Sequence, residues 1–370
     1  AFYEVIKENL EQLNPPLERF FATGVTPLTL DSLTSGFNIA TKITNNPLFT
    51  AMCGLTEDEV RYAIKESGVP NPEEAFNKMQ ENYDGYKFSL EAKNQIYNSN
   101  MCLYFLSRYI GLGKIPDDLI DMNIASDYSK IGKMLNLCQG ENKLEILRKT
   151  VQGEPIVTEI VEKFNPAIEF TEIDMISMLY YLGYLTISGE NFGTPELTIP
   201  NKVMKEIYAS YFMQLMDKEA DFRIDNNTSM EILREIAREG KIDKMVKTLR
   251  IYLNNLSNRD LIKFDEKYIK LIFYCISMTM PIYSVKSEME VNRNYPDILL
   301  VPRDRTKGYK AIMVEFKYLK KGETAKLEDK QKEAREQIER YSQFDDIKDI
   351  EGLRKYTIVV AGNELYVEEI

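Results

Sequence analysis

The sequence predicts a mixed architecture that is mainly α-helical through its middle and α/β at its C-terminal end. Apolar residues recur mostly at helical spacing between residues 100 and 220, whereas several segments after residue 283 alternate with a period of two. The chain has 370 residues, and a single hydrophobic core rarely grows beyond about 300 residues. We therefore expect separate domains, and we divide the chain into residues 1–99, 100–224 and 225–370.

The N-terminal part begins with a predicted helix over residues 1–13, whose apolar residues fall on one face and which Pro15 ends. A buried strand is expected over residues 19–25, where it reaches a glycine turn. The sequence opens at Ala1 without a start methionine or a secretory signal. We therefore expect it to begin inside a longer protein.

Two further helices and a hairpin complete the predicted N-terminal part. Thr56 followed three residues later by Glu59 is the signature of a capping box, which predicts a helix from there to about residue 67. Pro72 favours the first turn of another helix. The aromatic, glycine-punctuated segment 83–97 predicts a short hairpin.

Residues 172–215 stand out within the helical middle region. A predicted helix leads to a strand at residues 184–187, a polar turn, a strand at residues 197–199 and another helix. This order is winged-helix-like. Such a unit is either a packing module or a DNA-binding element, and the scarcity of basic residues in the wing favours packing.

The C-terminal part is predicted to run as a helix, three strands, an amphipathic helix and two strands, an α/β order. The predicted strands are residues 283–291, 297–301, 309–318, 356–361 and 365–367, and the amphipathic helix is residues 323–344. Each strand has a bounded apolar or alternating pattern, and Gly362 supplies the turn of the final hairpin.

Composition excludes several classes of chemistry. The chain contains no histidine, which removes serine–histidine and cysteine–histidine triads, histidine bases and histidine-bound zinc. Its four cysteines show no CxxC spacing, so we expect buried free thiols and a reducing, cytoplasmic compartment. No apolar run approaches the roughly 20 residues that span a bilayer, so we expect no membrane association.

The charge is unevenly distributed along the chain. The formal net charge is −11, which argues against a broad nucleic-acid-binding surface. Residues 264–370 are nearly balanced, with 19 Lys+Arg against 20 Asp+Glu. Their basic clusters are Arg303, Arg305, Lys307 and Lys310, and Lys317, Lys320 and Lys321. A nucleic acid would therefore meet the C-terminal third, although charge alone favours a solvated hairpin and helix.

Three charged residues in the predicted C-terminal strands suggest a metal site. Glu315 and Lys317 are two residues apart in one strand, so both project from the same face while Phe316 faces the other. Asp297 begins a neighbouring strand, and two carboxylates with water suit Mg²⁺ or Mn²⁺. The lysine could orient or deprotonate the attacking water, or neutralise phosphate charge. Surface ion pairs are the alternative interpretation.

These segments resemble a known family. NYPDILL, MVEFKYLK and EAREQIERY are similar to the PD-(D/E)XK nuclease superfamily, a restriction-endonuclease-like α/β fold. More specifically, they resemble the nuclease-like domain C-terminal to bacterial AAA-ATPase-like proteins. The resemblance implies that Asp297, Glu315 and Lys317 are the motif residues and that Gln337 on the following helix has a positioning role. It also suggests Glu266 as a further metal ligand, although Glu266 is equally compatible with a solvated helix position.

The upstream segments extend the resemblance. PLERFFATGVTPLTLDSLTSGFNIAT, MCGLTEDEV and ENYDGYKF look like the distal half of the AAA-ATPase-like domain, which implies that residues 1–99 are a partial domain of that kind. The phosphate-binding loop G-x-x-x-x-G-K-[ST] is absent, because the fragment 111–114 lacks the remaining motif positions. The resemblance implies that the chain begins after that loop, so we expect neither ATPase activity nor tight ATP binding.

We consequently predict a Mg²⁺- or Mn²⁺-dependent nuclease that hydrolyses DNA, with nucleic acid as its partner and possible homo-oligomers. One alternative is a regulatory module that binds nucleic acid or protein on a nuclease scaffold. A second is an ATP-driven switch whose motor half lies outside this sequence. Retention of Asp297, Glu315 and Lys317 argues against the regulatory scaffold, and the missing phosphate loop argues against the ATP-driven switch.

Overall fold

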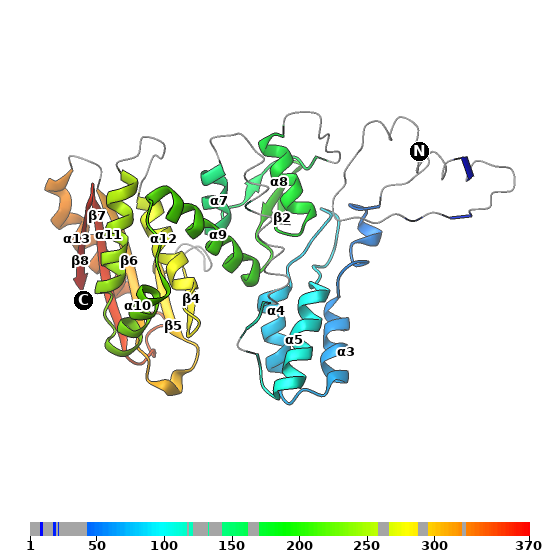
Figure 1. Cartoon of the computed structure of the whole chain (residues 1–370), viewed down its shortest axis with the longest axis horizontal. Helices are drawn as coiled ribbons and strands as arrows, with labels where there is room; N and C mark the ends of the chain where they lie inside the picture. Colours follow the sequence, from blue (N-terminus) through cyan, green and yellow to red (C-terminus); the bar gives the residue numbers. More distant parts are fainter. Residues whose placement is uncertain are drawn as a thin grey trace. The chain divides into compact units, whose positions relative to one another are not determined.

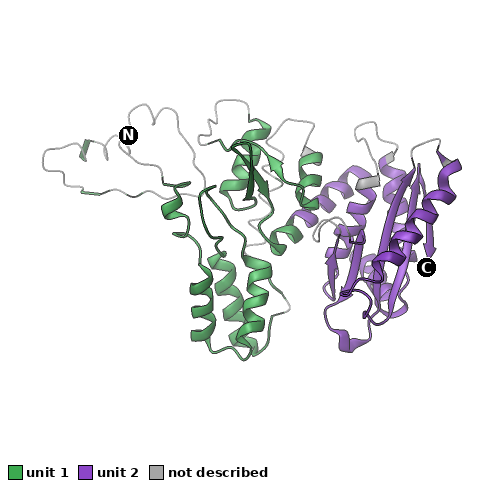
Figure 2. Ribbon diagram, turned by 180° about the vertical axis from the view of Figure 1, so that it is seen from behind, with its two compact units in different colours: residues 1–207 green, residues 208–370 purple. Residues whose placement is uncertain are grey.

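The computed structural model describes residues 43–116, 118–120, 143–161, 170–257, 266–287, 295–319 and 323–370, with a few positions before residue 43 and at residue 132. The chain divides into two compact units, Ala1–Ile207 and Tyr208–Ile370 (Figure 2). Each unit is described by itself. The boundary falls inside one helix, and the three-part division made from the sequence stays a prediction.

The first unit is built from helices and a small sheet (Figure 1). Its elements are η1 (Pro47–Phe49), α3 (Glu57–Ser67), α4 (Pro72–Tyr83), α5 (Ser99–Leu112), α7 (Lys143–Gln152), β1 (Ile156–Val157), α8 (Glu172–Tyr181), β2 (Thr186–Asn191), β3 (Thr194–Thr198) and the start of α9 (Lys202–Ala220).

The helix predicted after Thr56 is confirmed, together with its capping box. The hydroxyl of Thr56 accepts a hydrogen bond from the Glu59 N–H at 3.3 Å, and the Glu59 carboxylate accepts one from the Thr56 N–H at 2.8 Å. Gly68 then ends α3 in the left-handed conformation, with φ of 65°. The predicted start of α4 at Pro72 is also confirmed.

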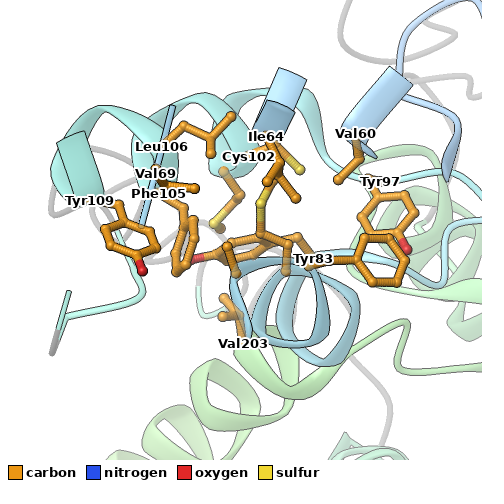
Figure 3. Packing of buried hydrophobic residues seen from close by; sticks show 14 residues of the cluster. Val60, Ile64, Val69, Tyr83, Tyr97, Cys102, Phe105, Leu106, Tyr109 and Val203 are labelled. Atoms are coloured by element: carbon orange, nitrogen blue, oxygen red, sulfur yellow. The ribbon is translucent and has the colours of Figure 1, made fainter. Parts of the chain in front are cut away.

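Helices α3, α4 and α5 pack around a common apolar core (Figure 3). The side chains at its centre are fully buried and come from all three helices: Val60, Ile64, Phe76, Met79, Met101, Cys102 and Phe105. Val203 of α9 joins the same cluster. The predicted helical spacing of apolar residues therefore corresponds to one shared interior.

The hairpin predicted over residues 83–97 is confirmed only at one antiparallel bridge, where the Tyr86 and Ile96 backbones exchange hydrogen bonds of 3.1 and 2.9 Å. Tyr83 ends α4, and the rest of the segment forms only isolated bridges, Tyr86 with Ile96 and Leu55 with Tyr97. Tyr86 and Tyr97 are buried, so the aromatic residues enter the core instead of alternating across a two-stranded ribbon. Gly85, with φ of 98°, permits the close approach of Pro200.

The glycine-rich fragment 111–114 lies at the end of a helix. Helix α5 ends at Leu112, and the left-handed Gly113 donates its N–H to the carbonyl of Tyr109 at 2.9 Å. A phosphate-binding loop instead precedes a helix N-terminus, where backbone N–H groups are free to meet an anion. The local geometry therefore agrees with the rejection of this fragment as a phosphate loop.

The order of helix, strand, turn, strand and helix predicted for residues 172–215 is confirmed. The sheet has the order β1–β3–β2 with antiparallel pairing throughout, and Thr171 caps α8 through a capping box with Asp174. Phe192 at the tip of the β2–β3 turn is fully exposed and has φ of 51°. The winged-helix interpretation of this unit stays a prediction.

The second unit is an α/β layer structure. After the end of α9, its elements are α10 (Asn226–Glu239), α11 (Asp243–Ser257), α12 (Glu266–Met278), β4 (Tyr283–Lys286), β5 (Ile298–Pro302), η2 (Arg305–Lys307), β6 (Ala311–Leu319), η3 (Thr324–Lys326), α13 (Leu327–Tyr341), β7 (Leu353–Ala361) and β8 (Glu364–Glu369).

Its five strands lie in sequence order, β4–β5–β6–β7–β8. All neighbouring pairs are antiparallel except β6 and β7, which are parallel and joined through α13. A parallel pair requires such a crossover connection, so the helix predicted between these strands is part of the sheet topology. The central strand β6 therefore has neighbours on both sides.

Helices cover the two faces of this sheet (Figure 1). On one face, Phe316 of β6 packs edge-on against Phe273 of α12, with ring centroids 5.6 Å apart. On the other face, Met313 of β6 joins a buried cluster with Ile338 of α13. Because Phe316 and Met313 lie on opposite faces, residues 313, 315, 317 and 319 of β6 all project toward α13.

Several sequence-based expectations concern single residues. Cys102 and Cys275 are buried free thiols, but Cys53 is exposed, so the expectation of buried thiols is wrong there; Cys138 lies outside the described residues. The predicted helix over residues 1–13 and strand over 19–25 also fall largely outside them. In the part of the chain that the structure describes, no helix combines the length and apolar character needed to cross a membrane.

Candidate active site

Asp297 and Glu315 face each other across neighbouring strands. β5 and β6 pair antiparallel with Ile298 opposite Val314, so the same register, continued by one residue, places Asp297 opposite Glu315. Directly opposed residues have Cβ atoms about 4.5–5.5 Å apart and project from one face. Two carboxylates 18 residues apart in the sequence therefore meet where β5 begins, beside β6.

Each carboxylate also accepts a hydrogen bond from the backbone of the opposing strand. The Phe316 N–H donates to Oδ2 of Asp297 at 2.6 Å, and the Asp297 N–H donates to Oε2 of Glu315 at 3.4 Å. These bonds form just before β5 begins, where the ladder of backbone hydrogen bonds has stopped. They orient both side chains and leave one oxygen of each carboxylate for another partner.

A lysine ammonium occupies each remaining oxygen. Lys317 donates to Oε1 of Glu315 at 2.7 Å and to the Phe316 carbonyl at 3.3 Å, which confirms that Glu315 and Lys317 share a face. Lys270 of α12 forms an ion pair with Oδ1 of Asp297. The cluster thus combines two carboxylates and two ammonium groups, and its formal charge is zero.

The cluster is shielded from water, which changes its protonation. Asp297 and Glu315 are 7% and 3% exposed. Burial, and secondarily the charge of Asp297, raise the pKa of Glu315 to about 7, although Lys317 acts in the opposite direction. Burial acts to lower the pKa of Lys317, but the carboxylates around it, Glu315 first, outweigh burial and raise that pKa. Lys317 therefore stays protonated at neutral pH.

Residues 264–370 match the family described as the PD-(D/E)XK nuclease superfamily. The matched range begins just before α12 and contains the entire five-stranded sheet, α13 and the acidic pair. The C-terminal part of the chain is a PD-(D/E)XK nuclease superfamily domain. No curated protein gives a significant match to the chain.

Gln337 lies on α13, the helix that packs against β6 and β7. Its Oε1 atom is buried and accepts no hydrogen bond in the described structure. Glu333, one helical turn earlier, lies close enough to Lys317 to raise the pKa of that lysine. Gln337 therefore offers an unused acceptor on the helix that covers the site, which suits a bound water or substrate donor.

The remaining sequence-predicted residues differ in their placement. Glu266 is the first residue of α12, and its side chain lies outside the described residues, as do Lys320 and Lys321. The basic hairpin between β5 and β6 lies at the far end of the strands from Asp297. Of the described residues in the two basic clusters, Lys317 therefore contacts the acidic pair.

Lys270 is the site residue that the sequence reasoning missed. It is the only charged residue between Tyr268 and Met278, and its neighbours in α12 are buried apolar side chains. A charge among buried apolar side chains requires a partner, because isolated charges are rarely left in protein interiors. That signal was present in the sequence, but it does not identify Asp297 as the partner, since Glu266 lies four residues earlier in the same helix.

The donor chemistry of the site fits a hard divalent cation. Asp297, Glu315 and the Phe316 carbonyl present oxygen atoms, the ligand type that Mg²⁺ and Mn²⁺ prefer. Among the described residues, no group of three or more Asp, Glu, Cys or His side chains could hold a metal ion. A cation held by the acidic pair would take its remaining ligands from water, from the Phe316 carbonyl or from Glu266, whose side chain lies outside the described residues.

Proposed function

We propose that residues 264–370 hydrolyse phosphodiester bonds of DNA with the help of Mg²⁺ or Mn²⁺. The observation that carries this proposal is the buried pair Asp297 and Glu315, opposed across β5 and β6 with Lys317 bonded to Glu315. The superfamily match over the same residues supports a nuclease. DNA as the substrate and Mg²⁺ as the cofactor are parts of the proposal.

In the proposed mechanism, Asp297 and Glu315 hold the cation, and Glu266 is a further candidate ligand. When bound, the divalent ion supplies a Lewis acid that polarises the scissile phosphate and acidifies a water molecule. The backbone N–H groups of Phe316 and Asp297 hold the two carboxylates in orientation. Gln337 would use its buried acceptor to orient a water or a substrate hydrogen-bond donor.

Lys317 contributes positive charge in this mechanism. Its pKa lies above the ordinary value for lysine, so near neutral pH its ammonium group has no free electron pair with which to remove a proton. The group can instead orient the attacking water and stabilise negative charge that develops on the phosphate. This argument favours the charge-stabilising role over the general-base role.

We further propose that residues 1–99 correspond to the distal part of an AAA-ATPase-like domain. The support is the order of the segments that resemble that domain, beginning near Pro16 and ending near residue 99. Because the sequence carries no phosphate-binding loop, we expect no tight ATP binding by this chain. Micromolar affinity in calorimetry with Mg²⁺ present would contradict that expectation.

A cleavage assay tests the nuclease proposal. Linear duplex, supercoiled and single-stranded DNA, and RNA, should be incubated with Mg²⁺, Mn²⁺ or Ca²⁺ at low ionic strength, because contacts between basic side chains and phosphates weaken as the salt concentration rises. Mg²⁺ and Mn²⁺ should support DNA cleavage, and Ca²⁺ should support it poorly because its coordination is looser. Lys317→Met should slow cleavage by about a hundredfold or more, the usual cost of losing one charge-stabilising group.

Lys355→Met is a matched control for this lysine. Lys355 lies on β7 of the same unit, is similarly half-buried and forms an ion pair with Glu339 at 2.6 Å. Its removal should leave cleavage unchanged. If folded wild-type protein cuts none of the substrates with Mn²⁺, the enzyme proposal fails, and the regulatory-module interpretation replaces it.

A further inference from the structure

All four carboxylate oxygens of the acidic pair already have partners in the metal-free protein. One oxygen of each carboxylate accepts a backbone N–H, from Phe316 or Asp297, and the other accepts an ammonium group. The backbone donors are fixed by the pairing of β5 and β6. A metal ion that binds Asp297 therefore competes chiefly for Oδ1, the oxygen that Lys270 occupies.

An ammonium group and a divalent cation cannot share that oxygen without strong repulsion. Asp297 is nearly buried, and the side chain of Lys270 is only 15% exposed, so little water is present to screen the two positive charges. Coordination of a cation by Asp297 therefore requires that the ammonium group of Lys270 move away.

The two lysines of the cluster pair with different carboxylates. Lys317 is two residues from Glu315 on the same strand, and it also contacts the carbonyl of Phe316. Lys270 reaches Asp297 from a separate helix. A cation that binds Oδ1 of Asp297 therefore displaces Lys270 directly, whereas Lys317 bonds to the other carboxylate.

We propose that Lys270 is a built-in competitor of the divalent ion. In the metal-free protein its ammonium group neutralises Asp297, and the ion must displace it in order to bind. Lys270 thereby lowers the affinity of the site for Mg²⁺ or Mn²⁺ while it keeps the empty acidic pair compatible with the fold. This inference rests on the proposed metal site, and it adds a positioning residue that acts through Asp297.

The test is a titration of the metal-stripped full chain with Mn²⁺, followed through the electron paramagnetic resonance signal of the free ion at neutral pH. Lys270→Met and Lys270→Gln should bind Mn²⁺ about tenfold more tightly than the wild type, within the usual range for coupled binding events. Lys270→Arg keeps the competing cation and should stay close to the wild-type affinity. Lys355→Met removes a half-buried, ion-paired lysine elsewhere in the same unit, and it should also leave the affinity for Mn²⁺ unchanged.

A double-mutant cycle ties the effect to Asp297. The gain from Lys270→Met should disappear in the Asp297→Asn background, because the competition concerns that carboxylate. Circular dichroism establishes that each variant is folded, and the Gln variant serves if the Met variant is not.

The outcomes separate this inference from the proposed function. If the wild type binds Mn²⁺ and the Met and Gln variants bind no more tightly, the competitor role is overturned while the metal site stands. A gain that persists without Asp297, or that Lys355→Met reproduces, also overturns the competitor role. If neither the wild type nor the Lys270 variants bind Mn²⁺, both the inference and the proposed metal site fail.

Discussion

Replacement of Glu315 by Gln should make the metal-free protein less sensitive to pH. Burial and the nearby charge of Asp297 raise the pKa of Glu315 to about 7 from an ordinary value of 4.5. The folded protein therefore holds the carboxyl proton more tightly than the unfolded chain does between these two pH values. This carboxyl group favours folding most below pH 4.5, and that contribution is lost as the pH rises through about 7.

The size of the effect follows from the shift. One pKa unit corresponds to about 1.4 kcal/mol, so the full contribution is about 3 kcal/mol, of which about 2.5 kcal/mol is lost between pH 5 and pH 8. Gln resembles the protonated carboxyl group but does not titrate. Relative to the wild type, Glu315→Gln should thus be more stable by about 2.5 kcal/mol at pH 8 than at pH 5. Lys317, whose pKa is raised, remains protonated at both values.

The measurement must report on the second unit alone, because a chain of two units need not unfold in one step. Urea unfolding in the presence of EDTA, followed by hydrogen exchange mass spectrometry on peptides from β6, reports on the strand that carries Glu315. Glu336→Gln is the matched control, since it makes the same substitution on an exposed position of α13.

A free-energy difference between variant and wild type that is the same at both pH values, within about 0.5 kcal/mol, would refute the reasoning. It would mean that the carboxyl group of Glu315 is not desolvated in the folded protein. A pH-dependent difference of similar size in Glu336→Gln would also refute it, because the effect would then not arise from burial at β6.

Two predictions concern the first unit. Thr56→Ala should lower the free energy of unfolding by about 1 kcal/mol, because α3 loses its N-cap; unchanged hydrogen exchange in α3 would contradict this. Gly85→Ala should destabilise the fold by about 3 kcal/mol or more, since its Cβ would lie 2.0 Å from the Pro200 carbonyl oxygen at a φ of 98°. Unaltered thermal unfolding, with Gly68→Ala as a comparison at an open position, would refute the close approach of Pro200.

The acidic pair could be placed from the sequence because its geometry is local. Strand periodicity put Glu315 and Lys317 on one face, and the hairpin that joins β5 to β6 kept Asp297 beside them. Antiparallel neighbours connected by a short loop leave few registers that bury the apolar residues of both strands. For the same reason the predicted strands near residues 297–301 and 309–318 lie within a few residues of β5 and β6.

Sequence patterns predicted the structure less well where contacts between residues far apart in the sequence determine it. The segment 83–97 has hairpin composition and pairs with itself between Tyr86 and Ile96, yet Tyr97 bridges Leu55, and Gly85 packs against Pro200. Local signals cannot reveal that long-range contacts will compete with a two-stranded ribbon, which is only marginally stable by itself. Cys53 is a case of the opposite kind: it lies in an irregular segment and is exposed, although its side chain was expected to be buried.

In the metal-free protein, lysine side chains balance the charge of the acidic pair. Two carboxylates in one buried cluster repel each other, and β5 and β6 bring Asp297 and Glu315 together whether or not a cation is present. Lys317 lies on the same strand as Glu315, and the sequence motif already identified it. Of the two carboxylates, however, its hydrogen bond goes to Glu315. The negative charge of Asp297 is instead balanced by Lys270, which is 27 residues earlier in the sequence and lies on α12. A strand motif therefore identifies the groups that would bind a cation, whereas the groups that replace the cation in its absence depend on how α12 packs.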